Sequence, residues 1–189
     1  MKRFSTKMLC RAGIVAALYA ALTLPLGSLA FGALGFQIRP AEALTVLPLF
    51  YAEAIPALYV GCLLANLVTG TLWDVGLGAL CSLIAALGTF FAGRIIKNTP
   101  AKLVVGGLFP VLVNAFGIPA VLILSGFAYA GYWVMFAGLA LTQSVWVFAL
   151  GVPLYFGVAA LRKKGVSAFC DNRTGKPLDR PAPPRDAKV

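Results

Sequence analysis

Arg39 and Glu42 stand three positions apart in a chain that is otherwise mostly apolar. Both belong to the run Phe36–Pro48, FQIRPAEALTVLP, which lies between two long hydrophobic stretches. A guanidinium group offers a fork of N–H donors and a carboxylate offers two acceptor oxygens, so the pair suits recognition of a polar ligand. Inserting an ionisable group at membrane depth costs about 2.5–3.5 kcal/mol, so a functional role is the first expectation for both residues.

A structural interpretation of the same run stays open. Pro40 suits the first turn of a helix, where the helix dipole would favour the carboxylate of Glu42. Arg39 would then serve only as the ion partner of that carboxylate. The sequence alone therefore leaves two roles for the pair, ligand binding and helix stabilisation.

Other strongly polar residues are rare in the apolar stretches. The further candidates for ligand contacts are Asn66, Asp74, Asn114 and Gln143, with Trp73 and Trp133 as flat apolar partners. Amides and carboxylates bind polar ligand edges, and an indole stacks on a planar ring. Each candidate also has a structural alternative: a helix N-cap for Asp74, bonds between helices for the amides, and an interfacial position for the tryptophans.

The sequence lacks the residues that most enzymes and metal sites need. It contains no histidine, and its four cysteines show neither paired nor metal-ligand spacing. No GxxxxGK[ST] phosphate loop, GxSxG motif or HExxH motif occurs. We therefore expect no enzymatic activity, no metal and no cofactor. A membrane enzyme acting on a lipid or a modified base is the weakest alternative.

The composition indicates a membrane protein. Hydrophobic residues make up 60% of the 189 residues and charged residues 12%, with a mean hydropathy of +0.90, whereas soluble domains carry about 25% charged residues. The net charge of +10 comes largely from clusters at the ends of apolar runs, in Lys2–Arg11, Arg94–Lys102 and Arg162–Lys164. This distribution is typical of the positive-inside rule and of contacts with the lipid bilayer, so we expect no nucleic-acid partner.

The apolar runs predict an all-α membrane protein. The expected spans are Ala12–Ala33, the short Arg39–Ala52, Ala54–Leu72, Val75–Gly93, and two helices within Leu103–Leu161 that break at Ser125–Gly131. A crossing normally needs about 20 residues, so Arg39–Ala52 could instead be re-entrant. Basic clusters at both ends of the chain favour two cytoplasmic termini, which require an even number of crossings. We therefore predict six transmembrane helices with cytoplasmic N- and C-termini.

This topology divides the chain into three parts. They are a basic cytoplasmic N-terminus over residues 1–11, a six-helix substrate-binding domain over 12–166 and a polar cytoplasmic tail over 167–189. The tail is rich in proline and buries too little apolar surface to order itself. The first apolar run is too long for the core of a signal peptide, so we expect it to be retained as a helix.

The predicted topology also gives each polar side chain a depth. Glu42, Asn66, Asp74, Asn114 and Gln143 all fall in the outer half of the predicted bundle or at its outer mouth. The inner half of the predicted bundle is nearly free of such groups. Glu53 falls at the cytoplasmic end, where we expect its carboxylate to be solvated. Converging polar groups in an apolar wall predict a pocket that opens to the outside.

The run Arg39–Pro48, RPAEALTVLP, followed by Asn66 and by Trp73–Asp74, resembles the QueT family of queuosine-precursor transporters. The similarity in architecture extends from about Ala12 to Lys164. The resemblance implies a substrate-binding subunit (S component) of an energy-coupling factor (ECF) transporter in a bacterial plasma membrane. Such a subunit binds substrate from outside and docks on a transmembrane coupling subunit that two ATPase subunits drive.

A stripe of small residues in the first span could serve as a docking face. Ala12, Ala16 and Ala20 recur every four residues, with Gly13, Ala17 and Ala21 beside them. Small residues at this spacing let another helix approach closely, whether from this chain or from a partner. The family resemblance implies that Ala12, Ala16 and Ala20 dock on the coupling subunit.

The substrate that the resemblance implies is preQ1 (7-aminomethyl-7-deazaguanine) or a relative such as queuine. Its ring offers N–H donors that suit a carboxylate, and a carbonyl that suits an amide or Arg39. We expect Glu42 to bind the ring edge or the amine, with Asn66, Asn114 and Gln143 completing the contacts. The rival function is a self-sufficient, proton-coupled secondary carrier of a small planar nutrient, in which Glu42 or Asp74 would carry the proton.

Overall fold

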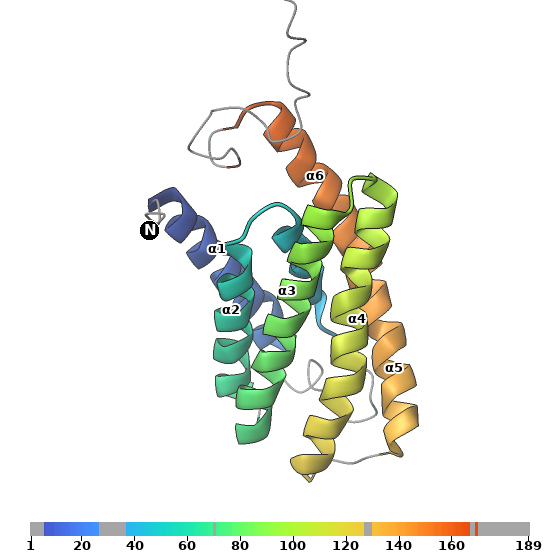
Figure 1. Cartoon of the computed structure of the whole chain (residues 1–189). Helices are drawn as coiled ribbons and strands as arrows, with labels where there is room; N and C mark the ends of the chain where they lie inside the picture. Colours follow the sequence, from blue (N-terminus) through green and yellow to red (C-terminus); the bar gives the residue numbers. More distant parts are fainter. Residues whose placement is uncertain (1–5, 27–36, 70, 127–129, 167–168, 170–189) are drawn as a thin grey trace, which may run out of the picture.

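The computed structural model describes residues 6–26, 37–69, 71–126, 130–166 and 169, and every regular element among them is a helix. In chain order these are α1 (Thr6–Thr23), the 3-10 helix η2 (Pro40–Leu49), α2 (Ala54–Thr69), the π-helix η3 (Asp74–Gly78), α3 (Ala79–Ile95), α4 (Thr99–Leu124), α5 (Tyr132–Ser144), the π-helix η4 (Val145–Leu150) and α6 (Gly151–Lys163). Figure 1 shows α2 to α5 side by side, with the start of α1 and the end of α6 toward the same end of the bundle.

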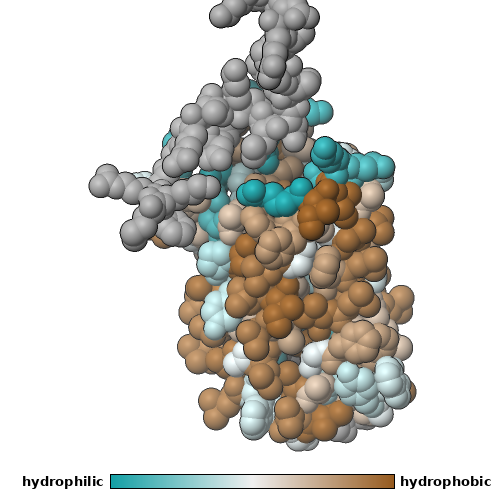
Figure 2. All heavy atoms as spheres, in the orientation of Figure 1, coloured by the Kyte–Doolittle hydropathy of each residue, from teal (hydrophilic) through white to brown (hydrophobic). Residues whose placement is uncertain are grey.

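Four helical stretches are long and apolar enough to cross a membrane: Thr6–Leu26, Asp74–Ile95, Thr99–Leu124 and Tyr132–Lys163. α2 is apolar but shorter, with the stretch Ala54–Val68. Hydrophobic residues cover most of the visible face of the bundle, and hydrophilic residues gather mainly at one end (Figure 2). This surface fits a lipid environment better than water, because a soluble protein rarely exposes an apolar patch of such extent.

The predicted short span forms η2, a 3-10 helix of 10 residues. At a rise of about 2.0 Å per residue this helix is about 20 Å long, compared with about 30 Å for the hydrocarbon core of a bilayer. Every residue from Ala41 to Pro48 is buried, so η2 lies inside the bundle and is covered by other helices. Its length is below that of a full crossing, and the six-span topology stays a prediction.

The boundaries of the first helix differ from the predicted ones. α1 begins at Thr6, not at Ala12, so Lys7 and Arg11 lie on the helix and not in a separate basic segment. It is followed by a single 3-10 turn up to Leu26. The end of the span expected over Ala12–Ala33 and most of the tail expected over 167–189 lie outside the described residues.

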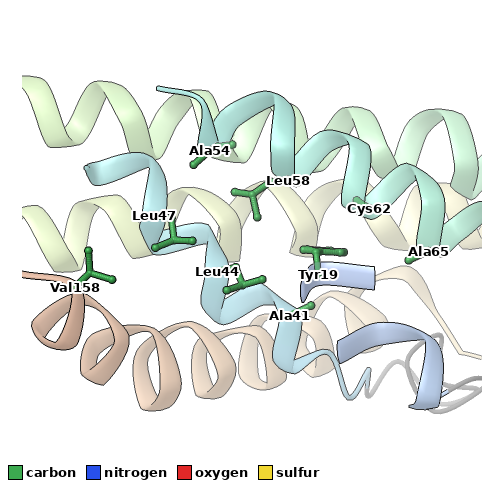
Figure 3. Close-up of a cluster of buried hydrophobic side chains, with 10 residues drawn as sticks. Tyr19, Ala41, Leu44, Leu47, Ala54, Leu58, Cys62, Ala65 and Val158 are labelled. Carbon is green, nitrogen blue, oxygen red and sulfur yellow. The ribbon is translucent and has the colours of Figure 1, made fainter. Parts of the chain in front are cut away.

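The periodicity of each helix explains how η2 packs at the centre. In a 3-10 helix every third residue shares a face, which places Ala41, Leu44 and Leu47 in one row. On α2 the buried residues Leu58 and Cys62 follow the spacing of an α-helix. These two rows meet, together with Tyr19 from α1, in the cluster drawn in Figure 3. The central segment is thereby held from several sides.

α1 and α2 approach each other closely at a glycine. A Cβ atom built on Gly61 would lie 2.7 Å from the Cβ of Tyr19 and 2.9 Å from the carbonyl oxygen of Ala16. Real Cβ atoms do not approach other atoms that closely, so the packing requires glycine at position 61. This contact fixes the height at which Tyr19 enters the centre of the bundle.

The expectation that Glu53 is solvated is wrong. Its side chain is buried and forms an ion pair with Arg11, with Oε1 and Nη2 2.8 Å apart. The guanidinium of Arg11 also stacks over the ring of Tyr51 at 4.5 Å, and that of Arg162 lies 5.2 Å from the ring centre of Phe50. Arg11 was expected in a segment before the first helix, whereas it lies within α1. From this helix its guanidinium reaches the turn before α2 and holds the carboxylate of Glu53 there.

Candidate functional site

Glu42 is the centre of a buried polar group. It lies in the first turn of η2 and is almost fully buried. The hydroxyl of Tyr19 donates a hydrogen bond to its Oε1 at 2.9 Å, and Nδ2 of Asn114 donates to its Oε2 at 3.4 Å. The hydroxyl of Thr45 donates to the backbone carbonyl of Glu42 at 2.6 Å. Both carboxylate oxygens are therefore bound by residues from other helices, α1 and α4.

Arg39 completes the charge pair at the N-terminal end of η2. Its Nε lies 3.8 Å from Oε1 of Glu42, and both residues are buried. Its Nη2 donates to the hydroxyl of Tyr19 at 3.3 Å and to Sγ of Cys62 at 3.6 Å. Removing one partner of a buried ion pair typically costs about 3–5 kcal/mol, because the other charge is left uncompensated. The pair links η2 to α1 and to α2.

Asn66 extends the group along α2 toward the start of η3. It is fully buried, and its Nδ2 donates to the backbone carbonyl of Asp74 at 2.8 Å and to Sγ of Cys62 at 3.6 Å. Its Oδ1 is buried and has no hydrogen-bond partner among the described residues. Cys62 therefore lies between Asn66 and Arg39, and the three side chains form a continuous polar row.

Asp74 is the first residue of the π-helix η3 and is only 7% exposed. It is not the N-cap that the structural alternative expected, because helical residues begin before it and no side-chain cap bond is present. Neither a cation within 4.0 Å nor a hydrogen bond to its carboxylate occurs among the described residues. Short π-helices are found often at functional sites, where they change the direction of a side chain.

Gln143 lies on α5, at the level of Asn114. In the cluster between α4 and α5, Ile118 and Leu122 pack with Leu139 and Met135. Helices joined by a short connection run antiparallel. Asn114 lies one turn before Ile118 on α4, and Gln143 lies one turn after Leu139 on α5. The two amide side chains are therefore at the same height. Gln143 is buried, and its Nε2 has no partner among the described residues.

The two candidate tryptophans lie apart from this buried group. Trp73 is 51% exposed and Trp133 is 70% exposed. The ring of Trp133 contacts those of Tyr132 and Phe136 edge-on, with centroids 5.3 and 5.9 Å apart. Stacking of either tryptophan on a ligand stays a prediction.

The small residues of α1 divide between an inner and an outer face. Ala16 is 8% exposed because it packs against Gly61 of α2, and Ala12 and Ala20 are half-buried. The neighbouring residues Gly13, Ala17 and Ala21 are exposed. At least Ala16 therefore serves packing within the chain, and docking of a partner through Ala12, Ala16 and Ala20 stays a prediction.

Sequence reasoning missed two members of the site, Tyr19 and Cys62. Tyr19 is buried and bonds to both Glu42 and Arg39, whereas most tyrosines in membrane helices lie at the interface. Its position in the middle of an alanine-rich run was the signal that could have identified it. Cys62 resembles the small apolar residues around it, so its sequence context gave no such signal.

The group as a whole suits binding of a polar ligand. Arg39, Glu42, Asn66 and Asn114 come together from η2, α2 and α4, as expected from their common depth. Within the described residues, no cluster of His, Cys, Asp or Glu could hold a metal ion. The remaining donors and acceptors are amide and carboxylate atoms, which recognise N–H and C=O groups of organic molecules.

The chain resembles known proteins at the level of the family. No curated protein and no solved structure matches the chain. One protein-family model does match, that of the QueT transporter, and it covers residues 9–160. The matched region contains the whole buried polar group and all of the apolar helices except the first residues of α1 and the last residues of α6. The chain therefore belongs to the QueT transporter family and is a membrane transporter protein.

Proposed function

We propose that this protein is the S component of an ECF transporter and that it binds a queuosine precursor such as preQ1 or queuine for import. The transporter family of the chain supports this proposal. The chain itself has no phosphate-binding loop of the GxxxxGK[ST] type. Energy from ATP would therefore come from two ATPase subunits through a transmembrane coupling subunit.

The observation that carries the proposal is the buried group around Arg39 and Glu42. These two charges lie at the start of the buried helix η2, which packs among helices apolar enough to cross a membrane. Such a position is costly, and other hydrogen-bonding residues of the bundle are directed at the same place. A bundle that needed only stability would be served as well by apolar residues there.

The chemistry of a deazaguanine matches this group. The N–H donors of its pyrimidine edge would bind the carboxylate of Glu42, which has lone pairs beyond those used by Tyr19 and Asn114. Asn66 and Gln143 each have one buried amide atom without a described partner, which a ligand could satisfy. Trp73 and Trp133 would contribute only if the outer loops closed over the ligand and carried their rings to it.

The proposed topology has six crossings with both termini in the cytoplasm of a bacterial cell. The start of α1 and the end of α6 lie toward the same end of the bundle, which suits an even number of crossings (Figure 1). Arg94, in the last turn of α3, and Lys97, between α3 and α4, would then face the cytoplasm. The polar group around Glu42 would lie nearer the outside.

The coupling subunit would dock on α1, which has the smallest buried share of the four candidate spans. Ala12, Ala16 and Ala20 are the proposed docking residues, and the exposed Gly13, Ala17 and Ala21 would widen the smooth face. Small residues at this spacing let two helices pack closely in a membrane, where hydrophobicity alone does not drive association.

Ligand binding by the purified chain tests the proposal. The chain in detergent, without any other subunit, is titrated with preQ1, queuine, guanine and two unrelated vitamins in a calorimeter. We expect tight binding of preQ1 or queuine, weaker binding of guanine and none of the vitamins. Tight binding of a vitamin, or no binding of any deazapurine, would overturn the proposal.

A proton-coupled carrier remains the second candidate, because Asp74 is a buried carboxylate without a described cation partner. Vesicles that contain only this chain would distinguish the two. Uptake of preQ1 under a proton gradient, without ATPase subunits, would favour the carrier. Uptake that appears only with the complete ATP-hydrolysing complex would favour the S component.

A further inference from the structure

The orientation of the Asn66 amide is fixed by its partner. Its hydrogen bond at 2.8 Å goes to the backbone carbonyl of Asp74, which can only accept. The atom at that position must therefore be the amide nitrogen, and the other atom must be the oxygen. That oxygen is buried and has no donor among the described residues. Asn66 thus presents an acceptor that lacks its hydrogen bond.

Asp74 presents a second acceptor, and its Oδ1 lies on the side of Asn66 that carries the amide nitrogen. Its side chain is more than nine-tenths buried, and its carboxylate receives neither a hydrogen bond nor an ion pair from a described residue. A Cβ atom built on Gly78 would press on Oδ1 of Asp74 and lie 3.1 Å from Nδ2 of Asn66. The two side chains therefore meet over the bare Cα of Gly78.

The charges of the buried group do not balance. Arg39 pairs with Glu42 and is also the described cation that acts electrostatically on Asp74, so one positive charge faces two carboxylates. The N-terminus of the helix that begins near Asp74 acts only as about half a positive charge. A carboxylate in an apolar region either takes up a proton or needs a full opposite charge close by, because water cannot solvate it there.

Glu42 differs from Asp74 in this respect. Its two oxygens already accept hydrogen bonds from Tyr19 and Asn114, and the guanidinium of Arg39 neutralises it. A ligand cation therefore gains more at Asp74 than at Glu42. Glu42 is left to accept N–H groups of a neutral ring edge.

We infer that Asp74 and Asn66 form a subsite for a positively charged, N–H-rich group of the ligand, such as a primary ammonium. The inference rests on the proposed function and adds to it a division of roles. Glu42 binds the neutral ring, and the Asp74–Asn66 subsite selects ligands that carry a cationic arm. Gly78 leaves room for the carboxylate of Asp74 beside Asn66, because a Cβ atom at that position would press on Oδ1 of Asp74.

Two ligands that differ only in the arm test this subsite. They are 7-aminomethyl-7-deazaguanine, which is cationic at neutral pH, and 7-cyano-7-deazaguanine, which is neutral and has the same ring. We expect the full-length wild-type chain to bind the aminomethyl compound at least about tenfold more tightly, as for a charge-assisted contact in a dry site. Asp74→Asn should reduce this ratio to about twofold or less, since its amide carries no charge.

Matched variants separate the subsite from general effects. Asp171→Asn removes a carboxylate that follows the last helix in the sequence, and it should leave the ratio unchanged. Gly78→Ala should weaken binding of the aminomethyl compound more than binding of the cyano compound. Gly76→Ala is its control, because a Cβ atom on Gly76 would meet nothing within 4 Å. If Asp74→Asn does not fold, the two glycine variants still decide the question.

The outcomes distinguish this inference from the proposed function. Equal binding of both compounds by the wild type, or an unchanged ratio in Asp74→Asn, would overturn the subsite while the proposed function stands. An equal loss of affinity for both compounds in Asp74→Asn would also overturn the subsite, because Asp74 would then bind the ring that the two compounds share. If the wild type binds neither these compounds nor queuine, the proposed function fails, and the subsite with it.

Discussion

At the scale of single residues, Tyr19 contributes both to the buried polar group and to the packing of α1. Its hydroxyl donates to Glu42 at 2.9 Å and accepts from Arg39 at 3.3 Å, and its backbone belongs to the outermost helix, α1. A hydrogen bond to a charged group contributes about 1.5–3 kcal/mol. In an apolar interior this bond both orients the carboxylate and holds α1 against the bundle.

Tyr19→Phe should therefore lower the free energy of unfolding by about 1.5–3 kcal/mol and weaken binding of preQ1. The measurements are unfolding in detergent and calorimetric titration. Tyr59→Phe is the control, because the hydroxyl of Tyr59 makes no hydrogen bond with a described residue. Equal stability of the two variants would show that the Tyr19 hydroxyl does not hold the site.

The ion pair gives a second prediction at this scale. Arg39→Met should destabilise the chain by about 3–5 kcal/mol, because the buried carboxylate of Glu42 loses its cation. The double variant Arg39→Met with Glu42→Met should lose less free energy of unfolding than the two single variants lose in sum. Additive losses in this double-mutant cycle would mean that the two residues do not act as a pair.

Residue types alone predicted part of the buried polar group. Arg39, Glu42, Asn66 and Asn114 were found because charged and amide groups are rare and costly in apolar runs, and the structure brings them together. Which neutral residue completes such a group depends on helix rotation and on close contacts. The contact of Tyr19 with Gly61 is of this kind and cannot be read from composition.

At the scale of helices, the sequence predicted where helices begin and end better than it predicted which kind of helix forms. The breaks near Ala54 and Ser125 agree with the observed helix ends, because apolar runs and turn residues mark them. The 3-10 conformation of Pro40–Leu49 was not predicted. Its apolar residues repeat every three positions, which a nearly continuous apolar run conceals, since almost every position is apolar.

Charged flanks were the least predictable part of the helices. Arg11 was expected to precede the first helix and Glu53 to be solvated, yet the two form a buried pair at 2.8 Å. A basic residue before an apolar run has the same appearance in sequence whether it faces lipid headgroups or reaches back to a neighbouring helix. Tertiary packing of α1 decides between the two.

The approach of α1 to α2 gives a prediction for the helices. Gly61→Ala should lower the free energy of unfolding by about 1–3 kcal/mol, because the new methyl group would overlap Tyr19 and the backbone of Ala16. Gly13→Ala is the matched control on the exposed face, where nothing lies within 4 Å. If both variants unfold alike in detergent, the close contact is not what holds the two helices.

At the scale of the whole molecule, the exposed face of α1 should matter for transport and not for binding. Ala17→Leu adds bulk at an exposed position of the proposed docking face, so uptake by the reconstituted complex should fall at least about tenfold while ligand affinity stays unchanged. Ala137→Leu, at an exposed position of α5, should leave both unchanged. An equal effect of the two changes on uptake would exclude a specific role for this face.

The central claim is that the buried group around Glu42 holds the ligand, and the dissociation constant of preQ1 for the wild type and for Glu42→Gln tests it most directly. The amide of glutamine places a donor where the ring donors of the ligand need an acceptor. We predict that the wild-type chain binds preQ1 and that the folded variant binds it at least about tenfold more weakly. Equal dissociation constants for the two folded proteins would contradict the account.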